Sequence, residues 1–331
     1  MSAAWRGFVV LLAGLVLAAL LNAQGLRKAA ESRPAGWERS AELAVARPLA
    51  RAAAWTRLDR PRHELQRAIG RGGVDTIDTS VDIAPAPTRP TLPAPTEPTP
   101  TAHGATTPKL VFSARRPLRI WVAGDSLAEV PGQALERAAA AAPAVRILPI
   151  ESRLSTGLGR PDLYNWFKRI PAALRQLHPK VAVLSFGADD AHNFMSGVPA
   201  GKHIGKLGTP SWDDEYVRRA AGVTRELNAR GITVVWLGLP IPRGRGFFYS
   251  FRIVNRLLRH VVAGAKPHAL YVDTWHMLAT PQGRYADYLR DPQGRLVQMR
   301  ASDGIHYTQT AGDLIARAIL AELGQVYELR R

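Results

Sequence analysis

Two short segments near opposite ends of the carboxyl-terminal two thirds of the chain carry residue types suited to nucleophilic chemistry. Ser126 follows the apolar run 118–123 and a Gly-Asp pair, and Asp303 precedes His306 by three positions. A serine hydroxyl becomes a nucleophile when a histidine accepts its proton and a carboxylate orients that histidine. The structural alternatives are a helix-capping turn at Ser126 and a simple Asp-Gly turn beside a surface histidine. The chemical interpretation predicts Ser126 as nucleophile, His306 as base and Asp303 as the group that orients the base.

The residues between these segments must bring them together, and their pattern predicts an α/β domain. Short apolar runs without polar alternation suit strands that are covered on both faces. Predicted strands are 118–123, 145–150, 181–186, 232–237 and 269–272, and predicted helices are 127–141, 162–177, 212–230, 251–265 and 310–327. Their alternation implies right-handed crossovers. We therefore predict a three-layer α/β/α fold around a mostly parallel, five-stranded, flavodoxin-like sheet, with Ser126 and His306 at its carboxyl edge.

The residues that precede the predicted sheet differ sharply from it. Residues 7–21 are almost wholly apolar and follow Arg6, which is typical of a signal peptide or an uncleaved anchor. A cleavage site ending at Ala23 would place Leu21, a large residue, at the third-last position. Because signal peptidases require small residues there, the sequence favours an uncleaved membrane anchor over residues 1–26.

Two further zones separate this predicted anchor from the domain. Residues 27–74 are rich in Arg and Ala and are expected to be helical, either near anionic headgroups or simply in solvent. Residues 75–108 are rich in Pro and Thr and predict a semi-rigid linker. Residues 109–331 then form the predicted domain. This organisation predicts a single-pass protein of the bacterial inner membrane whose carboxyl-terminal domain lies in the periplasm or otherwise outside the cytoplasm.

The composition excludes some classes of site. The chain has no cysteine, so it has neither disulfides nor thiolate metal ligands. Its formal net charge of +17 predicts attraction to polyanions, although widespread arginine from GC-rich codons accounts for such a charge equally well. No nucleic-acid recognition motif is present. Asp189, Asp190 and His192 are neighbours on one predicted loop and would not converge on a common ion, so neither a metal nor a cofactor is predicted.

The order of these motifs resembles that of the SGNH (GDSL) hydrolases over residues 118–325. The likeness extends to a membrane-anchored bacterial branch of that superfamily, through Ser155-Thr156-Gly157-Leu158, the stretch 236–240 and the stretch 300–308. The resemblance implies a nucleophile at Ser126, the dyad Asp303 and His306, and an oxyanion hole made by Ser126, Gly157 and the residue at position 189. At that last position the chain departs from the pattern, because Asp189 stands where the superfamily has Asn.

This departure matters because an ionised carboxylate donates no hydrogen bond and repels an oxyanion. A protonated Asp189 could donate to the oxyanion, and an Asp189 that turned away would leave the Ser126 and Gly157 N–H groups to stabilise it alone. Asn193 is an alternative donor from the following turn. Loops at the same edge predict substrate-binding roles for Asp125, Asp190, Lys202, His203 and Arg243. Lys202 and His203 belong to a Gly-rich basic loop that suits either a lid or an ordinary surface loop.

Together these features predict an envelope-anchored serine esterase or O-acyltransferase. Its expected partners are the membrane and an acylated substrate, either a cell-surface glycan or another small or polymeric molecule, with acetyl as the expected acyl group. The alternative is a catalytically weakened module that binds envelope polysaccharide or assists its assembly, which Asp189 favours. A third hypothesis is a polyanion-binding anchor protein that acts through residues 27–71.

Overall fold

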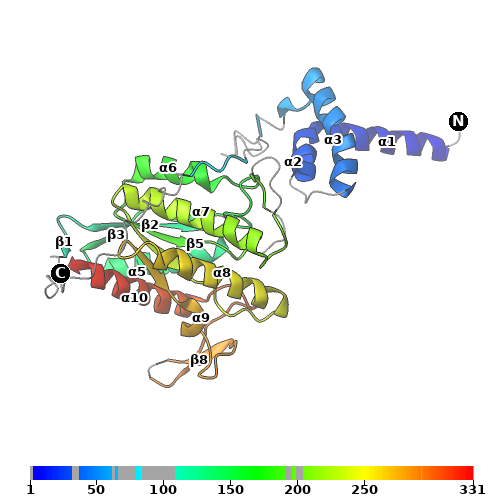
Figure 1. Cartoon of the computed structure of the whole chain (residues 1–331). Helices are drawn as coiled ribbons and strands as arrows, with labels where there is room; N and C mark the ends of the chain where they lie inside the picture. The colour runs from blue at the N-terminus through cyan, green and yellow to red at the C-terminus, as the bar shows by residue number, and fades with distance from the viewer. Residues whose placement is uncertain are drawn as a thin grey trace, which may run out of the picture. The chain divides into compact units, whose positions relative to one another are not determined.

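The computed structural model describes residues 3–31, 37–61, 64–65, 79–83, 109–190, 195–198, 204–291 and 293–330 (Figure 1). The chain forms two compact units, Met1–Thr79 and Ser80–Arg331. Most of the predicted Pro/Thr linker lies outside the described residues.

The first unit contains three helices, α1 (Ala3–Leu21), α2 (Ala23–Glu31) and α3 (Trp37–Thr56). Small residues on one face of α3 allow close packing against α2, and the buried set is Ala23, Ala30, Leu43, Ala46, Ala50 and Ala53. Large apolar side chains of α1 are exposed, among them Val10 and Leu11. In the described residues no single helix meets the length and hydropathy expected of a membrane span, but Trp5–Leu21 and Ala23–Ala30, bent by 71°, meet them as a pair.

The second unit is built on a parallel sheet. Its strands are β2 (Leu118–Gly124), β3 (Val145–Ile147), β5 (Val181–Ser185), β6 (Thr233–Leu237) and β7 (Ala269–Val272), in the order β3-β2-β5-β6-β7. A short strand, β4 (Glu151–Ser152), also pairs in parallel with the end of β2. All five predicted strands are therefore present, and the prediction of a mainly parallel α/β sheet is confirmed.

Helices cover both faces of this sheet (Figure 1). On one face α5 (Glu129–Ala140) packs against α10 (Gln309–Val326), and on the other α7 (Pro210–Ala229) packs against α8 (Arg245–Ala263), with α6 (Trp166–Leu177) beside them. The chain runs outward from β2 to β3 and then returns past β2 to β5, so the strand order is built in opposite directions on the two sides of β2. Right-handed crossovers in these two directions place helices on both faces of the sheet. A reversal of this kind opens a crevice at the carboxyl ends of β2 and β5.

Several elements differ from the sequence prediction. The helix expected from residue 162 begins at Trp166, because Asn165 caps it by accepting from the Lys168 N–H at 3.2 Å. The helix expected from 251 begins at Arg245, and a 3₁₀ turn, η1 (Ser126–Ala128), precedes α5. The sequence did not predict α9 (Thr274–Met277), the hairpin β8 (Tyr288–Arg290) and β9 (Leu296–Gln298), or the parallel pair β1 (Leu110–Phe112) and β10 (Tyr327–Leu329). These strands have only three residues each, too few for a periodic signal.

Part of the predicted linker belongs to the second unit. The Asn165 side-chain amide donates to the Ser80 carbonyl at 2.9 Å. Ile83 lies against Gly222 of α7, where an added Cβ would come within 2.7 Å of the Ile83 side chain. Residues 80–83 therefore pack on α6 and α7, ahead of the predicted start of the domain at residue 109.

Candidate active site

Ser126, His306 and Asp303 form one continuous hydrogen-bonded chain. His306 Nε2 lies 2.7 Å from Ser126 Oγ, and His306 Nδ1 lies 2.5 Å from Asp303 Oδ2. The Ser126 hydroxyl follows the end of β2, and the dyad lies on the loop before α10. The His306 and Asp303 side chains are 40% and 46% exposed, so the triad is open to substrate from solvent. The structure therefore brings the three predicted residues together.

The carboxylate of Asp303 is fixed in its ionised form. Its Oδ1 accepts the backbone N–H groups of Ile305 at 2.8 Å and His306 at 3.0 Å. Partial burial alone would raise the pKa of Asp303, but these bonds and the His306 ring lower it to about 2. Asp303 is therefore a carboxylate at neutral pH, and it holds the imidazole with Nδ1 protonated and Nε2 facing the serine as an acceptor.

The turn that presents Ser126 requires glycine before it. Gly124 has φ +154°, and an added Cβ would lie 1.9 Å from the carbonyl oxygen of Ser185 on neighbouring β5. The close approach of β2 and β5 at this point brings the loops that follow them together.

Asp125 stabilises this turn and does not face a substrate. It is fully buried, its Oδ1 accepts from the Leu127 N–H at 3.0 Å and its Oδ2 accepts from the Ala188 N–H at 3.1 Å. Burial and the nearby charge of Asp189 raise its pKa well above the ordinary value. Asp125 therefore ties the nucleophile turn to the loop after β5, which corrects the predicted substrate-binding role.

Asp190 has a similar buried role. Its carboxylate accepts the backbone N–H groups of Leu158 at 3.1 Å and Gly159 at 2.6 Å and the Tyr216 hydroxyl at 3.0 Å. Burial raises its pKa, and these three donors oppose that rise. Asp190 thus fixes the loop that carries Gly157, and its burial corrects the predicted substrate-binding role.

Two backbone N–H groups are available for an oxyanion hole. Within the described part of the chain, the N–H groups of Ser126 and Gly157 donate no hydrogen bond. Both lie on loops at the carboxyl edge of the sheet, after β2 and β4 respectively. Unused N–H donors beside a nucleophile can stabilise the negative oxygen of a tetrahedral intermediate.

Gly157 is sterically required in this arrangement, and Gly157→Ala is expected to lower kcat by about 10²-fold or more. An added Cβ would lie 2.1 Å from Asp190 Oδ1, so the loop or the carboxylate must shift and the Gly157 N–H must move with it. Steady-state ester hydrolysis measures the loss. Gly324→Ala on α10 is the matched control, since a Cβ there meets nothing within 4 Å. Equal activity of the two variants would contradict a role for the Gly157 N–H.

Glu215 and Arg219 support the site from α7, and sequence reasoning missed them. Both side chains are fully buried and paired at 2.8 Å. Arg219 also donates to the carbonyl oxygens of Leu158 at 2.8 Å and Ser196 at 2.7 Å. This guanidinium thereby joins the Gly157 loop to the segment after β5. The only signal in the sequence was an i,i+4 pair of opposite charges, which is far more common on exposed helix faces.

Arg243 fixes the triad loop. Its guanidinium donates to the Ser302 carbonyl at 2.9 Å and to Asp287 Oδ1 at 2.6 Å, and its backbone N–H donates to the Gly304 carbonyl at 3.0 Å. It emerges at the predicted edge, but these bonds assign it to positioning Asp303 and His306 and not to the predicted substrate contact. Lys202, His203 and the alternative donor Asn193 lie outside the described residues.

Asp189 lies beside the buried Asp125 and is half-buried itself. Its charge contributes to the raised pKa of Asp125, which places negative charge close to the nucleophile turn. The described residues contain no cluster of three His, Asp or Glu side chains arranged to hold a metal ion.

The hydrogen-bonded arrangement of Ser126, His306 and Asp303, between the end of β2 and the loop before α10, is the one that a serine nucleophile, its base and an orienting carboxylate require. The chain belongs to the family described as "Protein of unknown function (DUF459)", whose model matches residues 119–322. No curated protein shows significant similarity to the sequence.

Solved structures similar to this chain include three acyl-ester hydrolases. A lipase/acylhydrolase from Enterococcus faecalis has 16% identity and a TM-score of 0.46, over 64% of this chain and 98% of its own. The psychrotrophic esterase EstA from Pseudoalteromonas sp. has 16% identity and a TM-score of 0.42, over 63% and 97%. A variant of Axe2, an acetyl xylan esterase from Geobacillus stearothermophilus, has 14% identity and a TM-score of 0.43, over 67% and 99%.

Proposed function

We propose that this protein is a serine esterase or O-acyltransferase that acts on acyl groups, acetyl foremost, of a cell-surface glycan. The observation that carries the proposal is the continuous chain from Ser126 Oγ through the His306 ring to Asp303. A binding module would have no chemical need for a nucleophile, a base and an orienting carboxylate in bonded contact.

In the proposed reaction His306 Nε2 takes the proton of Ser126 as Oγ attacks the ester carbonyl carbon. The carbonyl oxygen becomes negative and accepts from the N–H groups of Ser126 and Gly157. The C–O bond then breaks, His306 returns the proton to the leaving alcohol, and an acyl-serine remains. Water or a sugar hydroxyl attacks the acyl-serine in the same way, and the choice of acceptor separates hydrolysis from transfer.

The proposed location is the bacterial inner membrane, with residues 1–26 as anchor and the second unit on the periplasmic side. Exposed apolar side chains along α1 and the combined length of the Trp5–Leu21 and Ala23–Ala30 pair support an anchor.

The test is covalent labelling combined with turnover. The full-length protein in a non-ionic detergent is expected to release 4-nitrophenol from its acetate ester and to react with a fluorophosphonate probe. Mass spectrometry of the labelled peptide is expected to place the adduct on Ser126, and Ser113→Ala serves as a control that leaves both signals intact. Absence of labelling together with absence of turnover would contradict the proposal. Labelling without hydrolysis would indicate a dedicated transferase.

A second candidate function, a weakened module that binds polysaccharide, is favoured by Asp189. We expect Asp189→Asn to raise kcat for a small ester by about 10- to 100-fold, because the amide supplies a donor and removes a charge from the oxyanion site. Steady-state kinetics beside the control Asp313→Asn, a carboxylate of α10 that is 45% exposed and pairs with Arg137 at 2.6 Å, measures the gain. A loss of activity in Asp189→Asn would instead show that the natural carboxylate has its own role in turnover.

A further inference from the structure

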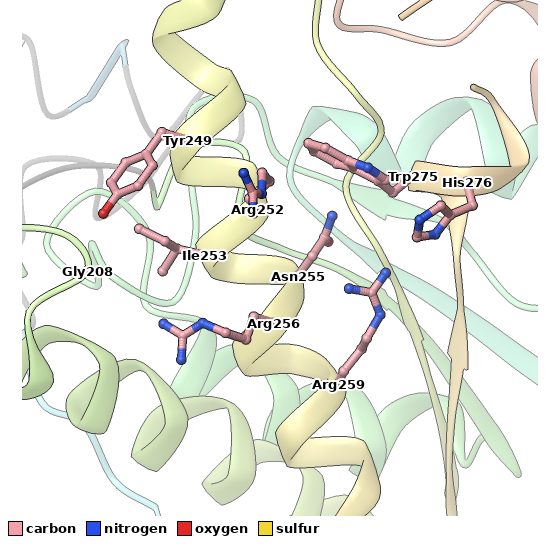
Figure 2. Close-up of a pocket in the computed structure, with 9 residues that line it drawn as sticks. All are labelled: Gly208, Tyr249, Arg252, Ile253, Asn255, Arg256, Arg259, Trp275 and His276. Carbon is pink, nitrogen blue, oxygen red and sulfur yellow. The ribbon is translucent and has the colours of Figure 1, made fainter. Parts of the chain in front are cut away.

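A cavity lies along α8, and none of its lining residues belongs to the triad or its loops. Its volume is about 490 Å³, and its walls include Tyr249, Arg252, Arg256, Arg259, Trp275 and His276 (Figure 2). A volume of this size suits a small ligand. Gly208 shapes one wall, because an added Cβ there would lie 2.8 Å from Ile253 Cδ1 and 3.2 Å from the Tyr249 hydroxyl.

The three arginines of the cavity carry more positive charge than the two neighbouring carboxylates, Asp213 and Asp273, neutralise. Arg256 uses Nη2 for Asp213 at 2.5 Å, and Arg259 uses Nη2 for Asp273 at 2.9 Å. Within the described chain Arg252 has no carboxylate partner, and it lies over the Phe248 ring at 5.9 Å. Positions 252, 256 and 259 follow one another along α8. In Figure 2 Arg252 lies between Tyr249 and Trp275, while Arg256 and Arg259 lie further along the helix and extend to its two sides. One full charge and most of the guanidinium N–H donors therefore remain for a ligand.

His276 adds an oriented imidazole to the same wall. Its Nδ1 lies 2.7 Å from Asp273 Oδ2 and its backbone N–H donates to Asp273 Oδ1 at 3.2 Å. This repeats the arrangement of His306 on Asp303, but here the side chain is 70% exposed and the described lining of the cavity includes no hydroxyl of Ser or Thr as a nucleophile. The second dyad therefore suits binding, with Nε2 directed to a ligand group, better than a second nucleophilic reaction.

We propose that this cavity binds a phosphate group carried by a small polar ligand. Guanidinium groups match the geometry of phosphate oxygens and bind them through paired charge-assisted hydrogen bonds. The aromatic faces of Trp275 and Tyr249 flank the arginines and would pack against the sugar or glycerol that carries the phosphate. The site is separate from the triad, so the proposal does not depend on esterase activity.

Isothermal titration calorimetry on the full-length protein in a non-ionic detergent tests this proposal. The probes are inorganic pyrophosphate, glucose 1-phosphate, glycerophosphoglycerol and, as an uncharged control, glucose. The first three are expected to bind and glucose is not. Tighter binding of glycerophosphoglycerol would identify a lipid headgroup as the source of the phosphate, and tighter binding of glucose 1-phosphate would identify a phosphorylated sugar.

Arg252→Gln is expected to weaken binding of these phosphates by about tenfold or more, the usual cost of losing a charged hydrogen bond. The matched control is Arg317→Gln on α10, which removes the same charge at an exposed site on the other side of the sheet. The thermal unfolding midpoint of Arg252→Gln is expected to match that of the unaltered protein, which shows that this variant is folded. Equal weakening in both variants, or no binding by the unaltered protein at millimolar phosphate, would overturn the proposal.

Discussion

Replacing His306 with alanine is expected to lower kcat/KM for a small ester by about 10⁴- to 10⁶-fold. The Ser126 hydroxyl then has no base at 2.7 Å to receive its proton, and the leaving alcohol has no acid. Because the triad acts as a unit, adding Ser126→Ala to His306→Ala should cost little more. Asp303→Asn should lose about 10⁴-fold, since an amide no longer holds the imidazole in the required tautomer.

Steady-state kinetics on the single and double variants measures these effects. His260→Ala at the exposed carboxyl end of α8 is the control for the loss of a histidine and should retain full activity. Thermal unfolding of each variant separates loss of chemistry from loss of fold. If the loss of kcat/KM in the double variant equalled the product of the losses in the two single variants, Ser126 and His306 would not act as a unit.

The second large effect is on stability. Glu215→Gln is expected to lower the free energy of unfolding by about 3–5 kcal/mol, because Arg219 would remain charged and fully buried without its carboxylate. The surface pair Glu226 and Arg230, at 3.0 Å and the same i,i+4 spacing, provides the control. Glu226→Gln should cost less than about 1 kcal/mol. Urea unfolding of both variants gives the comparison, and equal values would contradict the buried-pair argument.

The pair of Glu215 and Arg219 also makes the free energy of unfolding depend on pH. Burial would raise the pKa of Glu215, but its bonds to Arg218 and Arg219 overcome this and lower it from 4.5 to about 2. A carboxylate with a depressed folded pKa contributes stability that is complete above its unfolded pKa and is lost as the pH falls through the folded pKa. The unaltered protein should therefore lose stability between about pH 4.5 and 2 more steeply than Glu215→Gln. If the free energies of unfolding of the two proteins fell equally steeply with pH over that range, Glu215 would be excluded as a source of the pH dependence.

The sequence predicted the elements whose signal is local. Uniformly apolar runs predicted the five strands, and the order of those strands predicted that Ser126 and His306 meet at one edge. Side-chain roles inside the site were harder to predict, because the sequence of a motif is the same whether its carboxylate binds a substrate or a backbone N–H group. Asp125 and Asp190 are buried and bind N–H groups of adjoining loops. Their burial depends on how three loops meet, which no single segment specifies.

The buried charges of α7 illustrate the same limit. Glu215 and Arg219 lie on a helix whose amphipathic pattern assigns charged residues to the solvent face. They are buried because the segment around Ser196 and the Gly157 loop cover that part of α7, and their carbonyl oxygens accept from Arg219. A contact between segments so far apart in the chain leaves no periodic trace in either one.

The parallel pairing of β1 with β10 has a consequence for how the protein is made. Leu110 pairs with Tyr327 and Phe112 with Leu329, so β1 is matched by a strand that is synthesised after the whole of the central sheet. His306 also reaches Ser126 late, with α10 still to be added behind it. Nascent chains that stop before residue 327 would hold the serine and most of the sheet yet leave β1 without its neighbour. Synthesis of β10, and not the appearance of the nucleophile, therefore marks the moment at which this unit can close.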